Sequence, residues 1–127
     1  MPVSFRSRSW RTFRAEIGRR GFTRAVEVYA EFSKDSPGFT LKEEAVAAWA
    51  EELIADGNLV QATDVLELLM KVHPDSSTAY SDLGEAYWLS GKRAAAIDSY
   101  RKALDLAPDN DAARRGLEQA GASALTR

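Results

Sequence analysis

Apolar residues recur at helical spacing along almost the whole chain, and glycine and proline interrupt them at regular intervals. Three glycines fall where a first helix should end, since glycine turns the chain at no steric cost: Gly21, Gly57 and Gly91. Three prolines each follow a second helix, because proline cannot continue one: Pro37, Pro74 and Pro108. The pattern predicts seven helices, at about 8–18, 22–34, 40–56, 59–72, 77–89, 93–106 and 111–120.

The second and third helix pairs align with each other at an offset of 34 residues, without a gap. The third pair carries the fullest set of positions: Tyr80, Leu83, Gly84, Tyr87, Gly91, Ala96, Tyr100, Ala103 and Pro108. The first pair, built around Trp10, Phe13 and Ile17, fits after a one-residue deletion. These residue types and spacings resemble the tetratricopeptide repeat, a helix–turn–helix unit of about 34 residues. The repeats would cover about 7–38, 43–76 and 77–110.

This resemblance implies an all-α fold, a right-handed α-solenoid of three helical hairpins with a C-terminal capping helix over 111–120. One domain over 1–120 and a flexible tail over 121–127 are expected. Two departures from the repeat pattern stand out. Phe32 and Leu69 occupy positions where a small residue is usual, and three residues, 38–40, are inserted after Pro37. We expect the large residues to widen the helix packing around them. We expect the insertion to change the direction of the first hairpin.

The resemblance also implies that the first helix of each hairpin lines a concave groove, which holds a peptide or helix of a partner protein. The candidate groove residues are Arg8, Arg11, Glu44, Ala47, Glu51, Ile54, Ser81, Glu85, Trp88, Leu89 and Arg115. The glutamates would attract basic residues of a ligand, and the two N-terminal arginines would take an acidic end. Trp88, Ile54 and Leu89 would anchor an apolar side chain.

Trp88 follows the core position Tyr87 and is turned about 100° from it, toward the groove. The alternative is that Trp88 packs against the last helix or a neighbouring chain. Trp10 and Trp49 occupy positions that face the partner helix, so we expect them in the core. A carboxylate clamp of the kind that grips chaperone C-termini is not expected, because Asp82 would repel a ligand carboxylate.

Residues 41–110 also resemble the two-repeat tail of some bacterial serine hydrolases of the β-lactamase-like and esterase type. Such a hydrolase needs a nucleophile motif, and the only Ser-x-x-Lys, Ser99 to Lys102, lies inside the third repeat without its usual partner motifs. We therefore expect no enzymatic activity and no cofactor. An accessory or oligomerisation domain of such an enzyme, with a possible homo-oligomer, is the alternative to a peptide-binding scaffold.

The net charge of −2 is unevenly distributed. Residues 1–24 hold seven arginines and one glutamate, a net of +6, whereas residues 25–127 hold ten basic and eighteen acidic residues, a net of −8. The basic end could contact a polyanion, or its arginines could solvate the outer face of the first helix. Nucleic-acid binding is disfavoured, because Trp10, Phe13 and Ile17 are spaced to build the first hairpin.

Several functional classes are excluded by what the sequence lacks. There is no cysteine, which excludes disulfides and thiolate chemistry, and the lone His73 cannot form a metal site by itself. No apolar run approaches the ~20 residues that a membrane-spanning helix needs. A cytoplasmic protein that binds a protein or peptide is the expectation.

Overall fold

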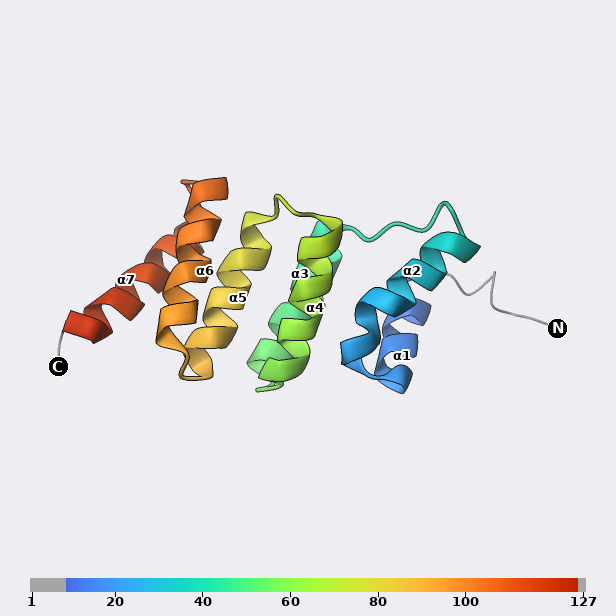
Figure 1. Cartoon of the computed structure of the whole chain (residues 1–127), viewed down its shortest axis with the longest axis horizontal. Coiled ribbons are helices and arrows are strands. Elements are labelled where there is room, and N and C mark those ends of the chain that lie inside the picture. The colour runs from blue at the N-terminus through green and yellow to red at the C-terminus, as the bar shows by residue number, and fades with distance from the viewer. Residues whose placement is uncertain (1–8, 126–127) are drawn as a thin grey trace. The chain divides into compact units, whose positions relative to one another are not determined.

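The computed structural model describes residues 9–125, and this part of the chain is helical with no strand (Figure 1). The elements are α1 (Trp10–Arg20), the short 3-10 helix η2 (Phe22–Arg24), α2 (Ala25–Asp35), α3 (Glu43–Ala55), α4 (Leu59–Val72), α5 (Ser77–Leu89), α6 (Arg93–Leu106) and α7 (Asp111–Leu125). The all-α class is thereby confirmed. None of these helices is both long and apolar enough to cross a membrane.

The chain divides into two compact units, residues 1–42 and 43–127. The described part of the first unit contains α1, η2 and α2, and the second unit contains α3 to α7. The single domain over 1–120 stays a prediction of the sequence. The boundary between the two units follows the three inserted residues 38–40, where the repeat spacing is broken.

The first unit is a hairpin closed by aromatic side chains. Helix α1 begins after Ser9, whose Oγ accepts a hydrogen bond from the amide of Thr12. Phe13 and Phe32 are almost completely buried, with ring centroids 5.4 Å apart in an edge-to-face arrangement. Phe39, from the inserted segment, lies 5.4 Å from Phe13 and 5.2 Å from Phe32. The insertion therefore supplies part of the core of this unit.

The second unit consists of two helical hairpins and a final helix. Helix α3 pairs with α4, and α5 pairs with α6, while α7 packs against both α5 and α6 (Figure 1). The turn of each hairpin contains a glycine with positive φ, Gly57 at 82° and Gly91 at 80°, as predicted from the sequence. Trp49 is 4% exposed and lies in the core, again as predicted.

Tyr100 is fixed between two helices by glycines on either side of its ring. A Cβ added at Gly84 of α5 would lie 2.7 Å from ring atoms of Tyr100, and one added at Gly116 of α7 would lie closer still. Neither glycine can therefore carry a side chain unless the ring moves. The sequence predicted the close approach at Gly84 but not the one at Gly116.

Helix α7 is attached to the preceding hairpin through its N-terminal cap. The side-chain oxygen of Asn110 accepts a hydrogen bond from the amide of Ala113 at 3.0 Å. Its side-chain nitrogen donates to Ser77 Oγ at 2.7 Å, and that hydroxyl donates to the carbonyl of Ala103 at 2.8 Å. These bonds fix where α7 begins. The helix runs to Leu125, past the end predicted at residue 120, since no proline interrupts it there.

Candidate functional site

The second unit contains two neighbouring cavities. The first has a volume of about 410 Å³ and lies between α5, α6 and α7. It is lined by Ser81, Asp82, Glu85, Trp88, Leu89, Tyr100, Ala112, Arg115, Gly116 and Gln119. The second has a volume of about 430 Å³ and is formed mostly by α3. It is lined by Glu43, Glu44, Ala47, Ala48, Glu51 and Thr78.

Helical periodicity explains why these side chains come together. On α5 the lining residues Ser81, Glu85 and Trp88 follow a spacing of four and three, which keeps them on one face. On α3 the lining residues Glu44, Ala47 and Glu51 follow a spacing of three and four. The lining residues of α7 show the same periodicity. Each cavity is therefore lined by successive turns of a helix.

A pair of carboxyl groups joins the two cavities. Asp82 lines the first cavity, Glu51 lines the second, and their side chains are hydrogen-bonded to each other. Burial, followed by this bond and the charges of Glu51 and Glu85, raises the pKa of Asp82 to about 9. Asp82 is therefore protonated at neutral pH and can share its proton with Glu51. We call the two cavities and this pair the acidic groove.

Tyr100 forms part of the wall of the first cavity. Its ring is 4% exposed and is fixed by Gly84 and Gly116. Burial, with the nearby charges of Glu85 and Asp82, raises its pKa to about 12, so the phenol stays neutral at physiological pH.

Trp88 and Leu89 form the apolar side of the same cavity. Trp88 is half-buried and packs against the cluster of Ala96, Tyr100, Ala103 and Ala113. Leu89 is 53% exposed. Trp88 therefore both packs against this cluster and lines the cavity, and its role as a binding anchor stays a prediction.

Most of the predicted groove residues line one of the two cavities. Ser81, Glu85, Trp88, Leu89 and Arg115 line the first cavity, and Glu44, Ala47 and Glu51 line the second. Ile54 lines neither and is only 6% exposed, because it packs into the core of its unit. Of the three residues predicted as an apolar anchor, Trp88 and Leu89 therefore line the first cavity and Ile54 does not. Arg11 is exposed on α1 in the first unit, and Arg8 lies outside the described residues.

Several lining residues were absent from the sequence-based set: Asp82, Tyr100, Ala112, Gly116 and Gln119. Asp82 had served only as an argument against a carboxylate clamp. Its position three residues before Glu85, on the same helical face, was the available signal. For α7 the signal was the spacing of Ala112, Arg115 and Gln119, which the interpretation of that helix as a cap left unused.

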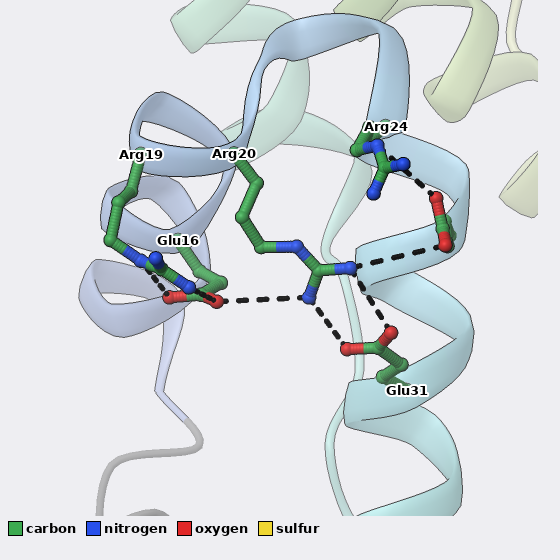
Figure 2. Close-up of polar contacts among 6 residues, drawn as sticks. Glu16, Arg19, Arg20, Arg24 and Glu31 are labelled. Carbon is green, nitrogen blue, oxygen red and sulfur yellow. Dashed lines mark hydrogen bonds and ion pairs between the residues drawn. The ribbon is translucent and has the colours of Figure 1, made fainter.

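The arginines of the first unit are largely engaged with neighbouring carboxylates (Figure 2). The guanidinium of Arg20 donates two hydrogen bonds to Glu31, at 2.7 and 3.1 Å, and lies 3.7 Å from Glu16. Arg19 donates to both carboxylate oxygens of Glu16, and this bond is the main cause that lowers the pKa of Glu16. The bonds of Arg20 to Glu31 connect α1 with α2, whereas the pairs with Glu16 lie within α1. The positive charge of this region is partly neutralised within the hairpin.

The Ser-x-x-Lys motif does not form a nucleophilic site. Ser99 is 7% exposed, so it is buried and not on the surface of its helix as the sequence suggested. The ammonium of Lys102 lies 6.0 Å from the ring centroid of Tyr80. Among the described residues, no group of three or more His, Cys, Asp or Glu side chains could hold a metal ion.

Known proteins resemble this chain in sequence and in fold. Residues 77–110 match the family model of the tetratricopeptide repeat. Over 101 residues the chain is 26% identical to the small glutamine-rich tetratricopeptide repeat-containing protein 2 of Mycosarcoma maydis. The match covers 80% of this chain but 28% of that protein, so the chain spans less than a third of this relative's length.

Solved structures show the same fold. The Sgt2 TPR domain from Aspergillus fumigatus matches with a TM-score of 0.61 and 24% identity, over 98% of this chain and 81% of that one. The P58(IPK) TPR domain matches with a TM-score of 0.59 and 24% identity, over 89% and 33% of the two chains. A MamA RS-1 double mutant matches with a TM-score of 0.61 and 22% identity, over 95% and 68%.

Proposed function

Because residues 77–110 are a tetratricopeptide repeat and the chain has the fold of tetratricopeptide repeat domains, we propose that this protein is a non-enzymatic interaction domain. It binds a peptide or helix of a partner protein in the acidic groove of residues 43–127. A fold of this kind supports many partners, so the proposal rests on the groove and not on the fold alone.

The observation that carries the proposal is that the two cavities lie next to each other. Each is large enough for side chains of a ligand, at about 410 and 430 Å³, and the bonded pair of Asp82 and Glu51 joins them. An extended peptide or a helix presents side chains at regular intervals, which suits a row of adjacent cavities better than one isolated pocket.

The chemistry of the lining favours a basic ligand with an apolar anchor. Glu44 and Glu51 are exposed in the second cavity, and Glu85 is exposed in the first. Their charges would speed the encounter with a basic segment and disfavour an acidic one. Trp88 and Leu89 provide apolar surface beside these charges, as a binding anchor requires. An acidic ligand end at Arg8 and Arg11 stays a prediction of the sequence.

The test is selection of peptides from a phage-displayed random library on the immobilised full chain. We expect enriched sequences that combine basic and apolar residues, and that bind at least about tenfold more weakly to Trp88→Ala and to Glu85→Lys. Asp98→Lys is the matched charge control, because Asp98 is exposed on α6 and lines neither cavity. Failure to enrich any sequence, or equal binding to all variants, would overturn the proposal.

A further inference from the structure

Asp82 presents an unusual combination of burial and unmet hydrogen bonding. The residue is 8% exposed and lines the first cavity, and its buried Oδ2 has no hydrogen-bond partner among the residues that the structure describes. A buried acceptor without a partner destabilises the folded state, because it has lost its hydrogen bonds to water. The neighbouring hydroxyl of Ser81 does not supply the bond, since it donates to the carbonyl of Thr78 at 3.1 Å. A ligand donor that reached this oxygen would remove this destabilisation.

The surroundings of this oxygen define the donor that fits. Glu85 contributes a second, exposed carboxylate on the following turn of α5, so two acceptors lie along one wall. Trp88 and Leu89 add an apolar surface next to them. A guanidinium group carries five N–H donors in a plane, stacks on aromatic rings and stands on an apolar stem. A cavity of about 410 Å³ leaves ample room for it.

We propose that the first cavity is a subsite for an arginine side chain of the bound peptide. The guanidinium donates to Asp82 and Glu85, and the stem lies along Trp88 and Leu89. The inference rests on the proposed function, in that the arginine belongs to a peptide held in the acidic groove.

The charges that face Asp82 from the surrounding helices favour a cation. Glu51 of α3 and Glu85 of α5 are acidic, and Tyr100 of α6 is a neutral phenol. Among the described residues that line the cavity, Arg115 of α7 is the one cation, and it is exposed. A long exposed arginine can turn its guanidinium into solvent at little cost. Arg115→Gln should therefore strengthen binding by removing like-charge repulsion.

Binding of an arginine at this subsite is linked to a proton. Because the pKa of Asp82 is about 9 in the empty cavity, the incoming cation would displace the proton and leave a carboxylate. Affinity should then rise with pH between about 6 and 9. The Asp82→Asn variant keeps a hydrogen-bonding side chain of the same shape but cannot lose a proton, so its affinity should be independent of pH in this range.

The experiment is an NMR titration of the 15N-labelled full chain at fixed ionic strength. The probe is N-acetyl-arginine methylamide, the neutral control of the same shape is N-acetyl-citrulline methylamide, and the lysine analogue tests the need for a planar group. We expect the arginine probe to bind about tenfold more tightly than the citrulline probe and several-fold more tightly than the lysine probe. The shifts should centre on the amides of Glu85 and Gly116 and the indole of Trp88.

Two variants make the result decisive. Asp82→Asn and Glu85→Gln should each weaken the arginine probe about tenfold, while Asp98→Asn on α6 should leave it unchanged. Equal binding of arginine and citrulline, equal binding of arginine and lysine, or unchanged binding to both cavity variants would overturn the subsite. Loss of the subsite with peptides still selected at the groove would leave the proposed function standing. Binding of the arginine probe without selection of any peptide would overturn the proposed function and leave the arginine subsite standing.

Discussion

The two units of this chain use charged residues in opposite ways. In the first unit, arginines and glutamates of α1 and α2 pair with each other, and Arg20 alone contacts three carboxylates within 4.0 Å. In the second unit, Glu51, Asp82 and Glu85 line cavities, and within residues 9–125 no cation is bonded to Asp82. The comparison indicates which charges hold the fold together and which are available to a ligand. It also explains why the acidic groove, and not the arginine-rich end, carries the proposed function.

The cores of the two units differ in a related way. The second unit follows the repeat pattern, with small residues such as Gly84 and Ala103 at the close contacts. The first unit has Phe32 at such a position and closes its hairpin with the rings of Phe13 and Phe39. Where the small residue is absent, an aromatic residue from the inserted segment packs against the larger ring that stands there. Each of the following substitutions acts on one side of this contrast.

Phe13→Ala should have the largest effect. The ring is fully buried and contacts both Phe32 and Phe39, so its removal leaves a cavity at the centre of the aromatic core and should cost about 3–5 kcal/mol of stability in this unit. Hydrogen exchange of the amides of α1 and α2 measures the loss. Val26→Ala is the control in the same hairpin, since Val26 is 36% exposed. Comparable losses of protection in the two variants would contradict the aromatic core.

Gly116→Ala should destabilise the second unit by about 1–3 kcal/mol, because the added methyl group meets the ring of Tyr100 and Gly84 blocks the ring on its other side. Hydrogen exchange of α5 to α7 is again the measurement. Gly121→Ala lies in the same helix with nothing within 4 Å of the added Cβ. That variant should gain up to about 1 kcal/mol from helix propensity. A gain in both variants would show that Tyr100 can move away.

The two units should respond to pH with opposite signs. The folded pKa of Asp82, about 9, lies above its ordinary value of 3.8, so the folded state holds the extra proton and stability falls as pH rises between these values. One extra proton in the folded state lowers the free energy of unfolding by at most about 1.4 kcal/mol for each pH unit. Asp82→Asn should remove this decline in stability with pH. The measurement is the urea unfolding of α3 to α7 at several pH values, followed by hydrogen exchange of their amides. An unchanged slope would mean that Asp82 is ionised in the folded state.

Glu16 provides the opposite case in the first unit. Its folded pKa lies below the ordinary value of 4.5, chiefly because of the hydrogen bond from Arg19. Its contribution is therefore present above that ordinary value and is lost as pH falls through the folded pKa. Hydrogen exchange of the amides of α1 and α2 should become faster in acid, and this increase should be smaller in Glu16→Gln than in the unsubstituted chain.

Arg20→Lys should have the smallest effect. Lysine keeps the charge but cannot donate two parallel hydrogen bonds to Glu31, so the hairpin should lose a small part of its stability, less than Gly116→Ala costs the second unit. The loss should shrink further at high salt, because the pair is partly exposed. Thermal unfolding at low and high salt tests this, with Lys34→Arg on α2 as a control. A larger loss at high salt would contradict an electrostatic role.

Local signals in the sequence were sufficient for most of the fold. The bounds of α4, α5 and α6 coincide with those predicted, because glycine and proline mark their ends on both sides. Helix α7 ran past its predicted end, since a low apolar content does not by itself stop a helix. The role of Phe39 could not be foreseen, because a ring in an inserted segment carries no periodicity that assigns it to either unit.

The candidate site was predicted less completely. Ser81 and Glu85, which lie on one helical face, were predicted from the resemblance to the repeat, and both line the first cavity. Ile54 has the same kind of spacing, yet it is buried, because the side chains that cover a residue come from other helices. Asp82 and Tyr100 required the packing of three helices around one cavity. Spacing within a single helix contains no information on such a contact.

The clamped ring of Tyr100 has a consequence for how such a protein could evolve. Because the ring lies against the backbones of Gly84 and Gly116, this part of the cavity wall is set by the main chain, and a side chain added at either glycine would displace the ring at a cost in stability. New ligand preferences would arise more readily at Glu85 and Gln119, which are exposed. Descendants of this domain could therefore change their ligands through a few surface mutations while they inherit the same wall.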